Sequence, residues 1–181
     1  MQVRRRQKLS YVGCTYAYKR ELQEIVRKTA EVMRKAGVDF GILGNQEICC
    51  GSPILKVGEK RLFEKMAKEN IDHFNSLKVG EVVTSCAGCY GIFKAYYPRV
   101  SKMNFKIFHI VEYLERMVNE GKIKFTREVP LTVTWHDPCH LGRMGEPYIP
   151  WDGERDKYGL YKPPESSIEV PLEYMNLLGR Y

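Results

Sequence analysis

The sequence predicts an α/β fold in which helices flank a parallel sheet, as in Rossmann-like domains. Three observations predict it: short apolar runs alternate with amphipathic segments of helical length, Gly or Pro ends several segments, and cysteines stand where predicted strands end. Strands separated by helices pair in parallel through right-handed crossovers. Residues 1–140 are therefore predicted to form one α/β domain. Residues 141–181 are rich in Gly and Pro, which predicts an irregular C-terminal extension.

The first two strand–helix pairs follow from the spacing of apolar residues. Residues 8–12 and 38–43 are short apolar runs, as expected for buried strands. Apolar residues then recur every three or four positions over 19–36 and over 58–77, which predicts two helices. Gly37 is a natural stop for the first helix.

The alternation continues as far as residue 135. Further strands are predicted at 81–84, 105–108 and 131–135. A helix over 86–97, stopped by Pro98, separates the first two of these strands. Another helix, over 110–119, follows the second, and Gly121 lies beyond its end.

The composition is that of a soluble protein. Of the 181 residues, 44% are hydrophobic and 28% charged, and no stretch approaches the roughly 18 apolar residues of a membrane helix. The basic start, Arg4 to Arg6, is not followed by the long apolar core of a signal peptide, so we expect a cytoplasmic location. The net charge of +7 comes from Lys and Arg residues spread along the chain, so we expect no nucleic-acid partner.

Five of the six cysteines are expected to share one edge of the sheet. They follow the first three predicted strands: Cys14, Cys49, Cys50, Cys86 and Cys89. The carboxyl ends of parallel strands meet at one edge, so cysteines far apart in sequence can converge there. Clustered thiols inside cells are more often metal ligands or redox groups than disulfides. The sequence therefore predicts a metal cofactor held by these five residues.

The cysteine pattern resembles a known family. Cys14, then Cys49-Cys50-Gly51, then the pair Cys86 and Cys89 is similar to the "CCG" motif of heterodisulfide reductase subunits and related iron–sulfur oxidoreductases. The run from His136 to Arg143 resembles the beginning of the second copy of the motif that family members carry. The following residues, 145–151, look most similar to the subunit of the sulfite-reduction-associated membrane complex and to the catalytic subunit of the membrane-bound heterodisulfide reductase.

The resemblance implies a cofactor and a function. In the family each complete motif is implicated in binding a non-cubane [4Fe-4S] cluster or, in some copies, zinc, so Cys14, Cys49, Cys50, Cys86 and Cys89 are the implied ligands. The implied function is an iron–sulfur electron-transfer subunit that passes electrons to, or cleaves, a disulfide-type bond. Implied partners are a ferredoxin-like iron–sulfur subunit, a membrane cytochrome, and a small thiol cofactor or carrier protein, which would place the chain at the periphery of a membrane complex.

This sequence also departs from the family pattern. It contains no second Cys-Cys-Gly and no ferredoxin-like cysteine module, so the first motif is complete and the second is truncated. The chain is then expected to be a fragment, a split subunit or a degenerate relative, with 141–181 a remnant or the start of a second half. Cys139, in the truncated copy, is a further candidate ligand.

Two other functions remain open at this point. A closed site of four thiolates around one zinc ion would make the protein a structural scaffold or interaction module. A metal-free dithiol oxidoreductase would use Cys86 and Cys89 alone. The weaker polar candidates are His136 and His140 for proton delivery, His109 as a helix cap, and side chains that flank ligands, namely Thr15, Tyr16, Ser85 and Tyr90.

Overall fold

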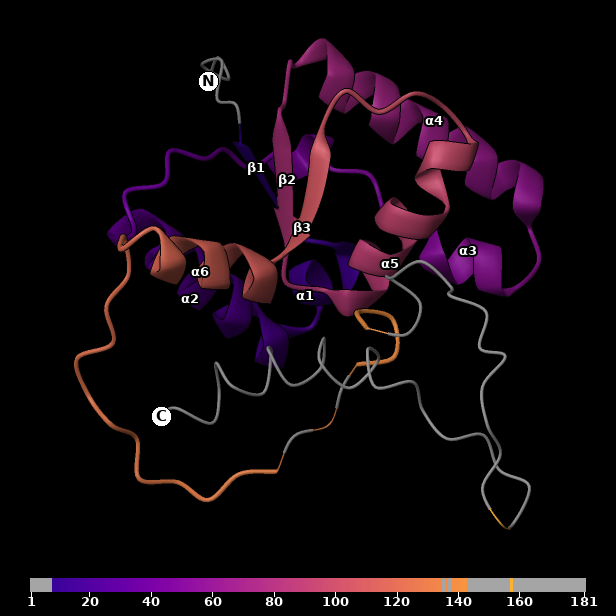
Figure 1. Ribbon diagram of the computed structural model, residues 1–181. Helices are drawn as coiled ribbons and strands as arrows, with labels where there is room; N and C mark the ends of the chain where they lie inside the picture. The colour runs from indigo at the N-terminus through magenta and orange to yellow at the C-terminus, as the bar shows by residue number, and fades with distance from the viewer. Residues whose placement is uncertain (1–7, 135, 137, 143–156, 158–181) are drawn as a thin grey trace.

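The computed structural model describes residues 8–134, 136, 138–142 and 157. It contains a sheet of three parallel strands in the order β1-β2-β3, where β1 is Lys8–Tyr11, β2 is Glu81–Thr84 and β3 is Lys106–His109 (Figure 1). Leu9 lies beside Val82, and Val82 beside Ile107. The predicted α/β class with a parallel sheet is therefore confirmed.

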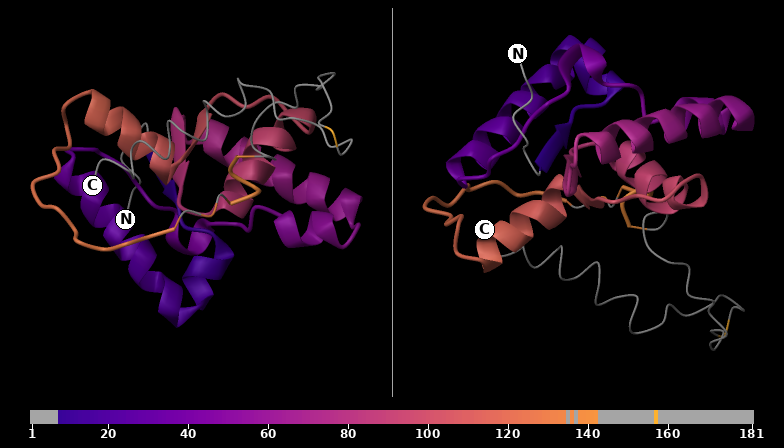
Figure 2. Two further views of the ribbon diagram at one scale, coloured as in Figure 1. Left: turned by 60° about the horizontal axis from the view of Figure 1, so that its bottom comes forward. Right: turned by 90° about the horizontal axis from the view of Figure 1, so that it is seen from above.

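Helices cover both faces of the sheet (Figures 1 and 2). On one side lie α2 (Gln23–Lys35) and α6 (Ile110–Asn119), and on the other lie α3 (Ser52–Lys56), α4 (Lys60–Ser76) and α5 (Ala87–Ala95). Successive strand residues point to opposite faces. Val82 accordingly packs in the core cluster of α4 and α5, while Val83 packs in the cluster of α2 and α6.

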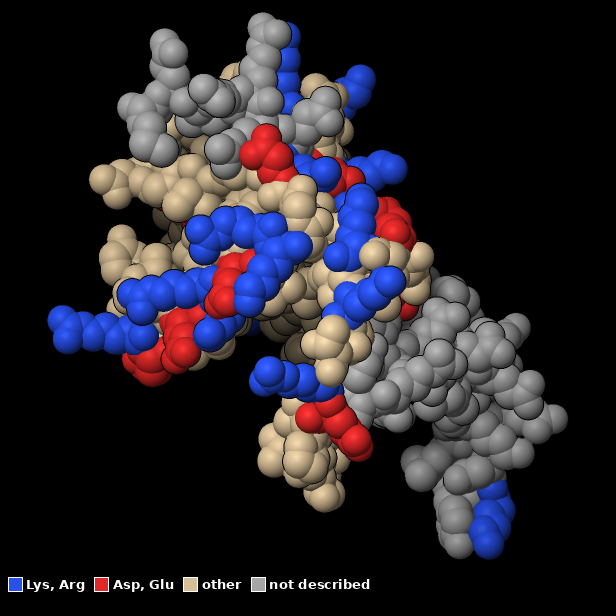
Figure 3. Space-filling view, turned by 90° about the vertical axis from the view of Figure 1, so that its left-hand side faces the viewer, with Lys and Arg blue, Asp and Glu red and all other residues tan. Residues whose placement is uncertain are grey.

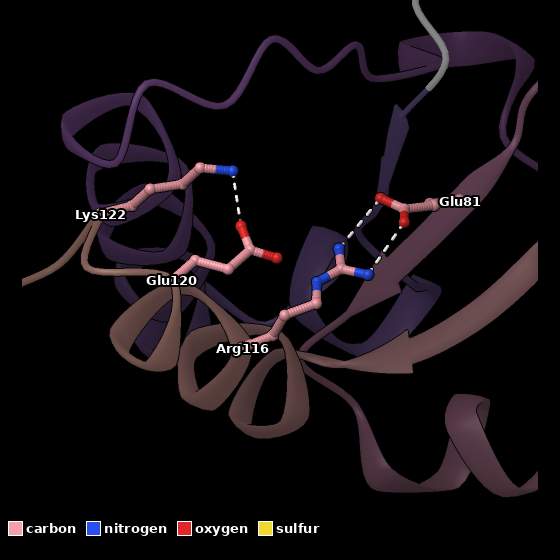
Figure 4. Close-up of polar contacts among 4 residues, drawn as sticks. All are labelled: Glu81, Arg116, Glu120 and Lys122. Atoms are coloured by element: carbon pink, nitrogen blue, oxygen red, sulfur yellow. Dashed lines mark hydrogen bonds and ion pairs between the residues drawn. The ribbon is translucent and has the colours of Figure 1, made fainter.

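Helix α6 begins and ends where the sequence predicts. His109 is its N-cap, and the carboxylate of Glu112 accepts the N–H of His109 at 2.8 Å, as in a capping box. The expected role of His109 as a helix cap is therefore confirmed. The guanidinium of Arg116, on the same helix, forms two hydrogen bonds with the carboxylate of Glu81 at 2.9 and 3.1 Å (Figure 4). This pair ties α6 to the start of β2.

The side of the molecule on which α2 and α6 lie is mainly basic. Lys and Arg side chains cover more of it than Asp and Glu side chains do (Figure 3). Several of the charges are neutralised by neighbours on the same helix, as where Glu31 contacts both Lys28 and Lys35. Such exposed pairs along a helix are typical of a solvated face.

Two predicted strands are wrong. Residues 38–43 form no strand, and Gly41 contributes only an isolated bridge to Leu9. Residues 131–134 are not a strand either, and Leu131 and Val133 are 70% and 71% exposed, while residue 135 lies outside the described residues. In both segments the apolar pattern suits a strand, but no neighbouring strand in the described part of the chain supplies a ladder of hydrogen bonds.

Several predicted helix boundaries are also corrected. The single helix expected at 58–77 is α4, and the shorter α3 precedes it. The helix expected over 19–36 is a 3-10 turn, η1 (Arg20–Leu22), followed by α2, and a short helix, α1 (Cys14–Tyr18), was not predicted. The remaining elements are two 3-10 turns, η2 (Gly44–Gln46) and η3 (Tyr97–Arg99). Within the described part of the chain, none of the helices combines the length and apolar composition of a membrane span.

The residues at the predicted domain boundary pack onto the core of the domain. Leu141 is buried in the core cluster of α4 and α5, and the carbonyl of His140 lies where a Cβ on Gly91 of α5 would approach within 2.8 Å. Figure 1 shows this segment in orange beside α5. The division into domains at residues 140 and 141 stays a prediction, and most of 141–181 lies outside the described residues.

Candidate metal centre

Three segments deliver cysteines to the carboxyl edge of the sheet. Cys14 is the first residue of α1, just beyond β1, and Cys86 is the N-cap of α5, just beyond β2, with Cys89 in the first turn of that helix. Parallel pairing of β1 with β2 brings these two segments to the same edge. Cys49 and Cys50 were expected to follow a strand. They lie instead between η2 and α3.

The five sulfur atoms form one linked series. The sulfur of Cys14 lies 3.5 Å from that of Cys49. Hydrogen bonds link the sulfur of Cys49 with that of Cys50, and the sulfur of Cys89 with those of Cys50 and Cys86. The five predicted site cysteines are therefore brought together, and none of them forms a disulfide.

The hydrogen bonds favour thiolates at two of these positions. The thiols of Cys49 and Cys89, followed by the N–H of Ser52 and the N–H of Cys50 itself, lower the pKa of Cys50 to about 3 against the effect of burial. The thiol of Cys89, with backbone N–H groups at the start of α5, lowers the pKa of Cys86 to about 6.

The two thiol donors have the opposite behaviour. The pKa values of Cys49 and Cys89 are raised, because each donates its proton to the sulfur of Cys50 and is partly or largely buried. The pKa is thus lowered at Cys50 and Cys86 and raised at Cys49 and Cys89, so Cys50 and Cys86 are the more acidic thiols of the site. Thiolates are the form in which cysteine binds soft and borderline metals.

Two glycines with positive φ shape the backbone around the sulfurs. Gly13, with φ of 81°, precedes Cys14, and a Cβ placed on it would lie 3.3 Å from the sulfur of Cys89. Gly51, with φ of 85°, turns the chain from Cys50 into α3, and a Cβ there would meet the Phe63 ring at 2.8 Å. Both positions thus favour glycine by conformation and by space.

A half-buried carboxylate joins two of the cysteine segments. Glu47, two residues before Cys49, accepts the N–H of Val12 at 3.0 Å and that of Gly13 at 2.7 Å. Burial raises the pKa of Glu47, while these two N–H groups lower it. The contact fixes the loop before Cys49 against the end of β1, next to Cys14.

Four residues near the site were not identified from the sequence: Tyr11, Glu47, Asn70 and Tyr97. Tyr11, Asn70 and Tyr97 donate hydrogen bonds to consecutive backbone carbonyls at residues 48, 49 and 50. For Asn70 the sequence held a signal, because it is a polar residue within the apolar stripe of the helix that is α4. In the structure Asn70 is fully buried. Buried amides of this kind need hydrogen-bond partners.

The weaker sequence candidates have mixed outcomes. Tyr16 and His109 both contact the carbonyl of Ser85, next to Cys86, at 3.3 and 3.2 Å. Tyr90 instead donates to Glu112. Thr15 is exposed.

The cysteine and histidines of the truncated motif lie outside the series of sulfurs. Cys139 and His136 are exposed, and His140 contacts the amine of Lys56 at 3.1 Å. Among the described residues, no hydrogen bond joins any of the three to the five sulfurs, and their roles stay predictions.

Within the described ranges, no three His, Cys, Asp or Glu side chains converge as a single metal ion would require. The sulfurs are joined pairwise along a series instead. The vicinal pair lies in its middle, between Cys14 on one side and the pair from α5 on the other.

Comparison with known protein families identifies the domain that carries these cysteines. Residues 9–94, which contain all five cysteines of the site, match the cysteine-rich CCG domain. This part of the chain is a CCG domain. The match covers the three cysteine segments and the two strands that align them.

The CCG domain has relatives among redox proteins. One of them is a component of the dihydromethanophenazine:CoB–CoM heterodisulfide reductase of Methanosarcina acetivorans. It is 36% identical over 138 residues, which is 74% of this chain and 33% of the relative. The EtfAB:quinone oxidoreductase of Syntrophomonas wolfei is 31% identical over 140 residues, 77% of this chain and 20% of the relative. The chain therefore spans a third or less of these relatives.

A third relative extends further along this chain. An uncharacterized iron–sulfur protein of Methanocaldococcus jannaschii is 34% identical over 172 residues, which is 94% of this chain and 30% of the relative. No solved structure matches significantly. The predicted membership of the CCG family and the predicted homology to heterodisulfide reductase are confirmed, while the likeness to the sulfite-reduction-associated protein stays a prediction.

Proposed function

We propose that this chain is the iron–sulfur electron-transfer subunit of a heterodisulfide reductase-like oxidoreductase. Cys14, Cys49, Cys50, Cys86 and Cys89 would hold a [4Fe-4S] cluster, non-cubane in form. The observation that carries the proposal is the continuous series of five sulfurs from three separate segments. The relative named as an iron–sulfur protein supports an iron–sulfur cluster as the cofactor.

The donor set fits this cofactor. Iron–sulfur clusters take cysteine thiolates, and two of the five sulfurs already favour that form. Sulfurs linked in series suit a polynuclear cluster better than a single ion, because adjacent members can bind different metal atoms. When bound, such a cluster would supply electrons one at a time, so reduction of a disulfide, which takes two electrons and two protons, would need two successive transfers.

The residues around the sulfurs have definable roles. Backbone N–H groups of Gly51, Ser52, Gly88 and Cys89 donate to the sulfurs and offset their negative charge. Cys50 and Cys89 are buried, and the aromatic side chains of Tyr11 and Tyr97 pack in the same core cluster, which excludes water from that side. These features stabilise charged sulfur in a site of limited solvent access.

We further propose that the chain acts with partner subunits. By its family, the donor would be a ferredoxin-like iron–sulfur subunit and the complex would include a membrane cytochrome, with this chain at the membrane periphery on the cytoplasmic side. The acceptor would be a small thiol–disulfide cofactor or a carrier protein. The oxidoreductase relatives, which are longer than this chain, support the general class of partner.

The test is metal content after anaerobic purification or reconstitution of the full chain. We expect about four irons and four acid-labile sulfides per chain, as a [4Fe-4S] cluster requires, and loss of both in Cys50→Ser. The matched control is Cys139→Ser, because Cys139 is exposed and lies outside the series of sulfurs. One zinc and no sulfide in the wild type would overturn the proposal in favour of a structural zinc module. Loss of iron in Cys139→Ser would show that Cys139 is a further ligand.

A further inference from the structure

Three consecutive backbone carbonyls around the vicinal cysteines accept buried side-chain donors. The hydroxyl of Tyr11 donates to the carbonyl of Ile48 at 2.8 Å, the amide of Asn70 to that of Cys49 at 3.1 Å, and the hydroxyl of Tyr97 to that of Cys50 at 3.1 Å. All three donors are at most 1% exposed. They come from β1, α4 and η3, so distant parts of the fold hold one short segment.

Two of these donors form a single hydrogen-bonded chain. The side-chain nitrogen of Asn70 also donates to the hydroxyl oxygen of Tyr97 at 3.0 Å, which leaves the Tyr97 proton for the carbonyl of Cys50. Only the nitrogen of the Asn70 amide can serve both acceptors, so its orientation is settled. Its oxygen has no hydrogen-bond partner among the described residues, although it is buried.

An unpaired buried acceptor is destabilising, so a residue that only stabilised the core would not be expected to carry one. Leucine would fill the same stripe of α4 without that penalty. The reason for an asparagine at this position is therefore its side-chain nitrogen, which donates hydrogen bonds to the carbonyl of Cys49 and to the hydroxyl of Tyr97.

Because the peptide unit is planar, fixing the direction of a carbonyl also fixes the direction of the N–H of the next residue. The described residues contain no cis peptide, and in a trans peptide the C=O and N–H point in opposite directions. With the carbonyl of Cys49 directed to Asn70, the N–H of Cys50 points the opposite way, and this N–H lowers the pKa of the Cys50 thiol. With the carbonyl of Cys50 directed to Tyr97, the N–H of Gly51 donates to the sulfur of Cys49.

We propose that Asn70 and Tyr97 are positioning residues that set the reduction potential of the cluster held by Cys49 and Cys50. They do so by fixing two peptide planes so that the N–H groups of Cys50 and Gly51 face the sulfurs and the carbonyl oxygens face Asn70 and Tyr97. This inference rests on the proposed function, because it needs a bound cluster. The polar atoms of both residues bind carbonyl oxygens, so their effect passes through the backbone.

The direction of the effect follows from charge. Reduction adds an electron to the cluster and its thiolates, and N–H donors stabilise the more negative state. If a carbonyl loses its donor, the peptide unit can rotate. The N–H of that unit then turns away from the sulfur, and the carbonyl oxygen, the negative end of the peptide dipole, can approach the sulfur. Both changes oppose reduction, so the midpoint potential becomes more negative.

The experiment compares midpoint potentials of reconstituted full-length variants. Tyr97→Phe removes one hydroxyl and keeps the ring that packs 4.6 Å from Phe93. Asn70→Leu removes the amide and also the unpaired oxygen. The matched control is Tyr113→Phe, which removes the hydroxyl of an equally buried tyrosine in the core cluster of α2 and α6. Iron and sulfide are measured for each, and potentials come from redox titration followed by electron paramagnetic resonance.

We expect wild-type iron and sulfide content in all variants, a more negative potential in Tyr97→Phe and Asn70→Leu, and no shift in Tyr113→Phe. Because the two residues form one chain, the double variant is expected to shift by less than the sum of the single shifts. Loaded variants with the wild-type potential, or additive shifts, would overturn the inference and leave the proposed function intact. A wild type that binds no iron and sulfide would instead overturn the proposed function.

A folding defect is separable from this effect. Asn70→Leu keeps the core apolar, so if Tyr97→Phe fails to fold, Asn70→Leu still reports on the same peptide. A variant that folds by circular dichroism but loads no cluster would assign the two residues to cluster assembly and contradict a role limited to the potential. The spectrum of the reduced cluster is a second readout, which a residue that merely stabilises the fold would not change.

Discussion

The sulfur of Cys14 lies 3.5 Å from the sulfur of Cys49, although the two residues are 35 positions apart in sequence. The contact depends on the neighbouring backbone, because Glu47 binds the N–H groups of Val12 and Gly13 just before Cys14. One carboxylate therefore sets the spacing of two cysteine segments that no regular hydrogen-bond ladder connects within the described residues.

Replacing Glu47 with Gln tests this link. Glutamine offers one acceptor oxygen where the carboxylate offers two, so its NH2 group would face a backbone N–H. We expect Glu47→Gln to lower the free energy of unfolding by about 1–3 kcal/mol, the usual cost of an unsatisfied buried polar group. Urea denaturation measures it, with the exposed Glu21→Gln as control. Equal unfolding midpoints for the two variants would refute the link.

Replacing Gly51 with Ala separates strain from steric conflict. The variant forces a positive φ on a residue with a Cβ and drives that atom against Phe63 at 2.8 Å. Gly58→Ala is the matched control, since Gly58 has φ of 91° but nothing lies within 4 Å of its Cβ position. We expect roughly 1 kcal/mol of destabilisation in the control and at least about 2 kcal/mol in Gly51→Ala. Thermal denaturation would decide, and similar losses would exclude the contact with Phe63.

The acid sensitivity of the fold is expected to involve His109. Burial lowers its pKa below the ordinary value of 6.5, against the carbonyl of Ser85 and the charge of Glu112. Between the folded and unfolded pKa values the unfolded chain binds more protons, so stability is lost as the pH falls below about 6.5. His109→Asn is expected to flatten the pH dependence of stability between pH 7 and pH 5. The control is the exposed His136→Asn, and an unchanged slope in His109→Asn would contradict the assignment.

The pair of Arg116 and Glu81 is expected to contribute more than an ordinary surface pair (Figure 4). Its side chains are 30% and 23% exposed, and the guanidinium lies 4.5 Å from the ring centres of Phe108 and Tyr113. Lysine cannot form the paired hydrogen bonds or stack as a planar group. We expect Arg116→Lys to cost about 1 kcal/mol, whereas Lys122→Ala, which removes an exposed pair, costs close to zero. Chemical denaturation at low and high salt tests both.

The sequence was sufficient for features that depend on local spacing. The helix at 110–119 has both its apolar periodicity and its cap residue in the sequence, and its bounds were predicted. The placement of Cys14 and Cys86 at the same edge of the sheet also followed, because parallel strands align their carboxyl ends. Their role as ligands stays a prediction.

The features that were missed depend on distant partners. Residues 131–134 have the alternation of a strand, but a strand exists only when another strand pairs with it, and that cannot be read locally. Likewise, Tyr97 is the last residue of a predicted helix, and nothing near it in sequence indicates that its hydroxyl reaches the carbonyl of Cys50, 47 positions away. Burial and polarity together make Asn70 unusual, but only the packed structure gives its acceptors.

The parallel sheet has a consequence for synthesis of the chain. Among the described residues, β1 pairs with β2 and otherwise only with Gly41. Leu9 therefore cannot pair with its strand partner until Val82 has been synthesised. At roughly 5–20 residues per second, that delay lasts several seconds. Cys14, Cys49 and Cys50 are therefore synthesised before Cys86 and Cys89 exist. Iron that arrives on the ribosome meets an incomplete set of thiols, so we expect productive loading only after α5 has emerged.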